Sequence, residues 1–461
     1  MPDEKWTPVS LHSIRGIVMY GSEKSDLGFM KQKRLLKYLL SVTVLVVGAL
    51  SADAARPQVD VPERQVVEGR DAVRGDLSLD RAIRLALDRN PDLRVGDARK
   101  DAALGRSEQA RAWPNPELEV FSQDMPASRS RMSQAKHMIG ISQTIPWPGK
   151  KQADRAIGAA GVAVGEAEAR MRRAELVKDV TIAYCQVQTA ERLAGVADDL
   201  VKVAQAAAVA AGKRNAAGEI TLQEMLRAEI QLEQTKADQV DSAREIDLAR
   251  LSLGLLLGGP DKRLGRLTDA LDDAADFSVT AADCSSWLSG HPAMLAVCAR
   301  HDQAVAAARR AGLESMPDIK VGVAGGRDES AEENLMELRF TFPLPLFDRS
   351  KGKRQEAQAG LREAEAEIAV TSQRLTADWR AGVARYQAAV RQLEAHRARI
   401  LPKSEDALRL IQRGFDEGKF GMMDLLDIQR TTAEARMAYQ KKLFEWHVAR
   451  AGLEAMVSPA H

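Results

Sequence analysis

Side chains able to do chemistry are scattered along this sequence and form no catalytic set. The seven histidines are dispersed, and His291 and His301 fall at helix ends or faces, where a capping or solvated histidine is commoner than a metal ligand. Most of the 15 methionines are dispersed or lie on helical stripes and favour core packing. A contact between a soft metal and Met422 or Met423, near a turn, is the alternative. We expect no enzyme activity, no cofactor and no resident metal.

A pair of acids beside a glycine-containing turn is the most informative polar feature. Asp424 and Asp427 are three residues apart, so they share one face of a helix within a turn of its tip. The equivalent place after an earlier turn holds Glu224 and Arg227, so only the first acid recurs. From the residues alone, Asp424 and Asp427 could simply solvate the positive N-terminal end of a helix.

Two proline-bracketed stretches, about 200 residues apart, repeat one pattern and indicate a tandem duplication. Apolar and polar residues alternate over 117–120 and 139–145 in the first copy, and over 319–324 and 336–342 in the second. A period of two with one apolar face predicts half-buried strands. Their length is close to the roughly 9–11 residues of a transmembrane strand. A soluble hairpin packed on a helix is the alternative.

Long helical patterns follow each strand pair. We expect helices from about 150 to 212 and from about 221 to 257, and again from about 353 to 413 and from 422 to 456. The first of these would be about 90 Å long. The apolar stripes have coiled-coil spacing and comprise Leu176, Val180, Ala183, Val187 and Ala190, then Trp379, Val383, Tyr386, Val390 and Leu393. Shorter helices should flank Asn90-Pro91 and His291-Pro292.

The composition narrows the class of protein. A net charge of +1 over 461 residues, with the basic residues spread among the acids, gives no sign of nucleic-acid binding. Aromatic residues make up only 4% of the chain, which is low for one large globular core. The body of the chain lacks a stretch of about 20 apolar residues, so a membrane-spanning part would have to be a closed β-barrel.

The N-terminal region is typical of an exported protein. Residues 1–29 form a possible non-native extension, residues 30–54 a signal peptide ending in an A-x-A site, and residues 55–76 a loose arm. The remaining domains are a first repeat at 77–257, a connector at 258–280 and a second repeat at 281–457. Of the three cysteines, Cys284 and Cys298 could pair in an oxidising compartment or remain free beside Cys185.

These elements imply an assembly. Four strands cannot close a barrel, because the smallest closed barrels have about eight, and open edges are not tolerated in lipid. Several copies must therefore pool their strands, and the same oligomer would pool its helices into a tube.

This pattern resembles the TolC-like outer-membrane efflux proteins over nearly all of residues 77–457, and is closest to the CzcC-like branch that serves heavy-metal efflux pumps. The resemblance rests on Asn90-Pro91, WPNPELEV, ISQTIPWPGK, FPLPLFDRSKGK and two glycine-containing helical turns. It implies a mainly α fold with a β-barrel part. Tandem helical hairpins would form a trimeric α-barrel crossing the periplasm, and four strands per protomer would build a shared outer-membrane barrel of about 12 strands.

The resemblance also implies partners and functional residues. The partners are a periplasmic adaptor (membrane fusion) protein, an inner-membrane pump of the RND type and outer-membrane lipid. Asp424 and Asp427, with Glu224, would ring the pore constriction. The adaptor would dock at the hairpin tips, on Lys213, Arg214, Gly218, Arg413, Phe415, Gly418 and Lys419; an uncontacted loop is the alternative. The cargo would be heavy-metal cations. The alternative functions are a multidrug duct of the same architecture, a periplasmic adaptor and a soluble coiled-coil scaffold.

Overall fold

The structure, a computed structural model, describes residues 75–123, 136–259, 264–269, 287–328, 331–417 and 419–457. The predicted extension, the predicted signal peptide, most of the predicted arm, Cys284 and Gly418 lie outside the described residues. Among the helices that are described, none is both long enough and apolar enough to cross a membrane.

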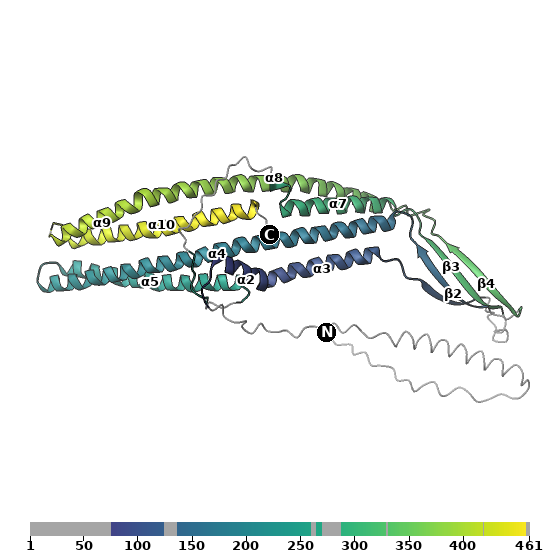
Figure 1. Cartoon of the computed structure of the whole chain (residues 1–461), viewed down its shortest axis with the longest axis horizontal. Coiled ribbons are helices and arrows are strands. Elements are labelled where there is room, and N and C mark those ends of the chain that lie inside the picture. The colour runs from purple at the N-terminus through teal and green to yellow at the C-terminus, as the bar shows by residue number, and fades with distance from the viewer. Residues whose placement is uncertain are drawn as a thin grey trace, which may run out of the picture. The chain divides into compact units, whose positions relative to one another are not determined.

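From α3 onward, the described elements follow the same plan twice along the chain (Figure 1). The first series is α2 (Leu79–Arg89), α3 (Pro91–Arg111), β1 (Glu117–Gln123), β2 (Lys136–Ile145), α4 (Lys150–Ala216) and α5 (Leu222–Leu256). The second series is α7 (Pro292–Gly312), β3 (Ile319–Asp328), β4 (Glu333–Thr341), α8 (Lys351–Ala395), η2 (His396–Ile400), α9 (Leu401–Asp416) and α10 (Met422–Val457). Each series places two strands before a long helical hairpin, as the repeated pattern predicts.

The same capping device precedes α3 and α7. The side chain of Asn90 accepts a hydrogen bond from the N–H of Asp92 at 2.8 Å, and Nδ1 of His291 accepts one from the N–H of Ala293 at 3.2 Å. A proline follows each cap, in the first helical turn, where its missing N–H costs nothing. The expected correspondence between Asn90-Pro91 and His291-Pro292 is confirmed for the cap and for the helix that follows it. The helix expected before His291 lies largely outside the described residues.

The four strands form one antiparallel sheet in the order β1-β2-β3-β4. β2 and β3 join the two halves, with Ile145 paired to Ile319, and β1 and β4 are the edges. One face of the sheet is apolar and exposed, as Met336 (81%) and Val120 (66%) illustrate. The predicted alternation is therefore confirmed in both strand pairs.

Two large apolar clusters pack the helices of the described part of the chain together. The first contains the predicted stripe of α4 together with Leu77, Ala82 and Ala86, and Leu253 from α5. Residues 264–269, within the predicted connector, add Leu264 to it. The second cluster contains Trp379, Val383 and Tyr386 of α8 with Trp446 and Leu453 of α10. Both predicted stripes are confirmed, and burial of these side chains is the main stabilising contribution to the helical part.

The long helix after β4 is not continuous, which corrects the prediction of one helix over about 353–413. It changes at η2 into one π-helical turn, in which the N–H of Leu401 donates to the carbonyl of His396 five residues back. Pro402 follows immediately. Because proline lacks an N–H and its ring collides with the carbonyl four residues earlier, a wider turn accommodates it.

Candidate functional site

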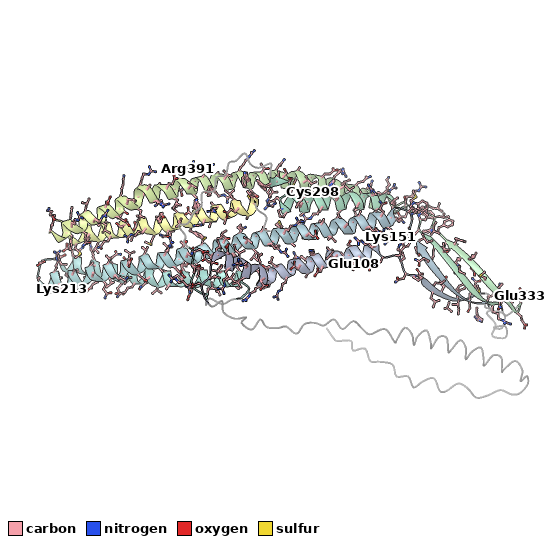
Figure 2. The ribbon with its side chains drawn as sticks, in the orientation of Figure 1. Glu108, Lys151, Lys213, Cys298, Glu333 and Arg391 are labelled. Carbon is pink, nitrogen blue, oxygen red and sulfur yellow. The ribbon has the colours of Figure 1, made fainter. Side chains whose placement is uncertain are left out.

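Backbone hydrogen bonds and one glycine close the turn between α4 and α5. The N–H of Gly218 donates to the carbonyl of Asn215, and the N–H of Glu219 to that of Arg214, both at 2.9 Å. Gly218 has a φ of 75°, which other residues rarely adopt. Lys213 and Arg214 lie in the last turn of α4 rather than in the loop, which corrects the expected helix end. Figure 2 shows Lys213 at the end of this hairpin.

The second turn, between α9 and α10, is closed by a shared carbonyl acceptor and by an aromatic ring packed on a glycine. The N–H groups of Lys419 and Phe420 both donate to the carbonyl of Gly414, at 2.7 and 3.3 Å. The Phe420 ring lies against Gly414 so closely that a Cβ there would be 2.3 Å from the ring. Lys419 pairs with Glu417 at 2.6 Å. A phenyl ring and a small residue thus shape this tip.

The two tips contact each other. The guanidinium carbon of Arg214 lies 5.3 Å from the centroid of the Phe415 ring, within the range of a cation–π interaction. Arg214 also lies 3.6 Å from the carboxylate of Glu219. Of the predicted docking residues, Arg214 and Phe415 are therefore brought together, whereas Lys213 and Arg413 are exposed at the two helix ends.

Glu224 and Asp424 each accept a hydrogen bond from a backbone N–H at the start of the helix that follows their turn. Glu224 and Thr221 form a capping box: the N–H of Thr221 donates to the Glu224 carboxylate at 2.8 Å, and the N–H of Glu224 donates to the Thr221 hydroxyl at 3.3 Å. The bonds from Thr221 lower the pKa of Glu224 below its ordinary value. The Asp424 carboxylate accepts from the N–H of Gly421, also three residues earlier, at 3.0 Å.

Asp427 is exposed one helical turn beyond Asp424 and lies 3.1 Å from Arg430. In the first hairpin, the position that corresponds to Asp427 is occupied by Arg227. The sequence located these residues correctly at the tips but missed the capping bonds, although the T-x-x-E spacing of Thr221 and Glu224 is a known signature of a capping box.

The sheet carries an ion-pair network that the sequence reasoning missed. On the face opposite the apolar one, the Glu119 carboxylate lies 2.9 Å from Lys320 and 3.1 Å from Arg339. Lys320 also pairs with Glu117 at 2.9 Å, and Arg339 with Glu337 at 3.0 Å. Strands that are not neighbours are thereby connected across the sheet.

Small residues on the middle strands let these long side chains reach one another. Gly140 of β2 lies opposite Ala324 of β3 on the charged face, and a Cβ on Gly140 would be 2.8 Å from that of Ala324. Alternation identified the polar face, but the contacts depend on the strand register, which no local sequence signal supplies.

Metal-ligating and nucleophilic groups are not gathered at these sites. Within the ranges that the structure describes, no group of three His, Cys, Asp or Glu side chains could hold a metal ion. Cys185 is buried beside Leu443, and burial raises the pKa of its thiol to about 11, so the thiol remains protonated. Cys298 is exposed. Whether it pairs with Cys284 or stays free, the two alternatives left open above, involves a residue outside the described ranges.

Comparison with known sequences identifies the family. The profile of the outer membrane efflux protein family matches residues 82–259 and 284–458, and the chain belongs to this family. It is 28% identical over 403 residues to the cobalt-zinc-cadmium resistance protein CzcC of Cupriavidus metallidurans, covering 86% of this chain and 93% of CzcC. It is 24% identical over 276 residues to the nickel-cobalt-cadmium resistance protein NccC of Alcaligenes xylosoxydans xylosoxydans, covering 57% and 59% respectively.

Comparison with solved structures confirms the fold class. The Campylobacter jejuni CmeC outer membrane channel superposes with a TM-score of 0.73 at 14% identity, over 83% of this chain and 85% of CmeC. The protein is thus an outer-membrane efflux channel subunit that extends into the periplasm, in a family of channels rather than enzymes. The readings as a periplasmic adaptor or a soluble scaffold are wrong.

Proposed function

We propose that this chain forms the passive outer-membrane duct of a tripartite efflux complex that exports heavy-metal cations. The observation that carries the metal cargo is the similarity to CzcC along nearly the whole length of both chains. NccC, whose name also records resistance to metals, is a second relative. The duct performs no chemistry of its own, and its energy comes from an inner-membrane pump of the RND type reached through a periplasmic adaptor.

A homotrimer is the assembly that the protomer favours. β1 and β4 are open edges of a four-stranded sheet, and lipid does not tolerate open edges. Three copies supply about 12 strands, enough to close a barrel. The helices also need partners, because Leu222, Leu226 and Ile230 form an exposed apolar stripe near the first tip. Such a stripe is suited to helix–helix packing between copies.

The hairpin tips would form the periplasmic entrance. In a trimer, Asp424, Asp427 and Glu224 would each occur three times around the axis. Rings of carboxylates at a constriction attract cations and repel anions, which suits metal cations as cargo. The exposed Lys213 and Arg413, with Arg214, Gly218, Phe415, Gly418 and Lys419, would form the surface that the adaptor contacts.

Deletion of this protein tests the cargo. In the deleted strain we expect intracellular zinc, cobalt, cadmium or nickel to rise and tolerance of the same metal to fall, while tolerance of drugs and dyes is unchanged. Expression of the intact chain should restore both. Sensitivity to drugs without accumulation of any metal would contradict the metal assignment and indicate a multidrug duct of the same architecture.

A further inference from the structure

The apolar face of the sheet ends in a row of polar side chains. Cross-strand pairing places four of them side by side, one from each strand, in what we call the polar row: Ser122, His137, Arg327 and Asn334. The row belongs to the apolar face because Ser122 lies two residues from Val120, and Asn334 two residues from Met336, on the same strands. A face that is otherwise exposed and apolar therefore changes its chemistry at one level.

The polar row lies at the extracellular end of the sheet. β3 ends at Asp328 and β4 begins at Glu333, each one residue beyond the row, and Figure 2 shows Glu333 at the end of the sheet remote from the helices. The channel subunit extends from the outer membrane into the periplasm. Because the helices are its periplasmic part, the opposite end of the sheet lies toward the cell exterior.

The distance along the strands matches the thickness of the membrane. His137 lies eight residues from Ile145 on β2, which is about 27 Å along an extended strand. With the tilt of about 40° that barrel strands have, this corresponds to about 21 Å of height, close to the apolar band of roughly 25 Å on outer-membrane barrels. If Ile145 lies at the periplasmic boundary of the lipid, the polar row lies among the headgroups of the outer leaflet.

The side chains between these two levels need no partner from outside the protein. Gln143 lies within the apolar rows, and its Nε2 donates to the carbonyls of Pro114 and Thr144 at 2.8 and 3.0 Å. In the polar row, Nδ1 of His137 lies 2.8 Å from the Ser122 hydroxyl, so Nε2 is the ring nitrogen left to contact a ligand. Arg327 and Asn334 are exposed.

The acids at this end of the sheet lie on the opposite face. Asp328 and Glu333 pair with each other in the next row, and Asp328 lies 3.7 Å from Lys136 on that face. Within the described strands, no Asp or Glu shares the face of Arg327. The polar row therefore presents a guanidinium, which recognises phosphate through parallel hydrogen bonds, directly beside an apolar surface.

We propose that the polar row binds a phosphate group of lipopolysaccharide, the phosphorylated glycolipid of the outer leaflet. Arg327 holds the phosphate through its guanidinium, and Asn334 and His137 donate further hydrogen bonds. The acyl chains of the same lipid lie along the apolar rows that begin at Val120 and Met336. The site is complete within one chain, so this inference goes beyond the proposed duct and is independent of its cargo.

Native mass spectrometry of the full-length protein, purified in detergent and stripped of lipid, tests the site. The probes are lipid A that bears two phosphates and the same glycolipid after its phosphates have been removed. We expect the protein to retain the phosphorylated probe about tenfold more than the other, as the loss of one charge-assisted hydrogen bond would produce. Equal retention of the two probes overturns the proposal without the need for any variant.

Substitutions locate the contact. Arg327→Gln should lower the retention of lipid A about tenfold, and Arg327→Lys, which keeps the charge but not the planar fork, should lower it less. Arg391→Gln is the matched control, because it removes an exposed arginine of α8 outside the sheet (Figure 2); its retention should equal that of the unaltered chain. Equal retention by the Arg327→Gln and Arg391→Gln variants overturns the assignment to the polar row.

A third probe separates two sources of the phosphate. Phosphatidylglycerol carries a phosphate on a phospholipid, and we expect it to be retained less than lipid A. Phosphatidylglycerol that is retained as well as lipid A, and is lost equally in Arg327→Gln, overturns lipopolysaccharide as the ligand. All variants are compared as proteins that size and conduct ions like the unaltered chain, so failure of this proposal leaves the duct intact.

Discussion

His291 and Asn90 cap equivalent helices with different chemistry, and only His291 adds a dependence on pH. Nδ1 of His291 must be unprotonated to accept the hydrogen bond from the N–H of Ala293. Burial lowers the pKa of His291 below its ordinary value because it disfavours the charged imidazolium. The unfolded chain therefore binds a proton at a higher pH than the folded chain does.

This difference predicts that acidification weakens the fold. Stability should fall as the pH drops below about 6.5, the ordinary pKa of histidine, because the unfolded state then binds more protons. The His291→Asn variant keeps a cap but loses the titrating group, so its thermal midpoint should change less between about pH 7.5 and pH 5.5. An equally large drop in both proteins would contradict the assignment to His291.

Thr221 should hold the first turn of α5 in place. Loss of an N-cap hydroxyl typically costs about 1 kcal/mol, so the Thr221→Ala variant should increase amide hydrogen exchange in the first turn of α5 by about fivefold. Thr431→Ala, within α10, is the control because its hydroxyl donates to the carbonyl of Asp427, four residues back in the same helix, and caps no helix end. Exchange unchanged in Thr221→Ala would show that the capping box does not stabilise this end.

The acids at the second tip should set ion selectivity if they ring the constriction. Asp424→Asn with Asp427→Asn should reduce the cation-to-anion permeability ratio by about half or more at 0.1 M salt, where the Debye length is about 10 Å. The control is Asp238→Asn, an exposed acid further along α5. Unchanged selectivity in the double variant would contradict the pore role.

Residues whose signal is local could be located from the sequence, whereas residues that meet only in the folded sheet could not. The spacing of Asp424 and Asp427 and the glycine turn before them are local, so the sequence located them at a helix tip. The ion pairs that the Glu119 carboxylate makes with Lys320 and Arg339 join residues that are far apart in the sequence. They form only once the register is fixed, and local spacing therefore could not reveal them.

At the scale of the element, the long helices were the most predictable feature. α4 has 67 residues and is about 100 Å long, and its stripe of small and apolar residues repeats over many turns. Its end was less predictable, because Lys213, Arg214 and Asn215 are polar residues that continue the helix without contributing to the stripe. The π-turn before Pro402 was missed, since a proline can also simply end or kink a helix.

The helix ends at the tips should determine docking of the adaptor. Lys213→Glu with Arg413→Glu reverses two exposed charges there and should strongly reduce cross-linking to the adaptor in cells, while ion conductance persists. Arg391→Glu reverses an exposed charge on α8, away from the tips (Figure 2), and should have little effect. Equal cross-linking in both variants would argue against docking at the tips.

At the scale of the whole molecule, the need for several copies could be predicted from the sequence alone. Two strand pairs per chain are too few for a barrel, and the structure adds that both edges belong to one continuous sheet. The cargo could not be predicted from ligands, because no metal-binding set is present in the sequence pattern; it depends on the similarity to CzcC.

Currents through planar lipid bilayers test the central claim most directly. The purified full-length protein, sized as a trimer, should produce discrete current steps without any energy source, and its reversal potential in a salt gradient should favour cations. A folded trimer that inserts into the bilayer but gives no steps at any voltage would contradict a passive duct, and steps that favour anions would contradict a pathway for metal cations.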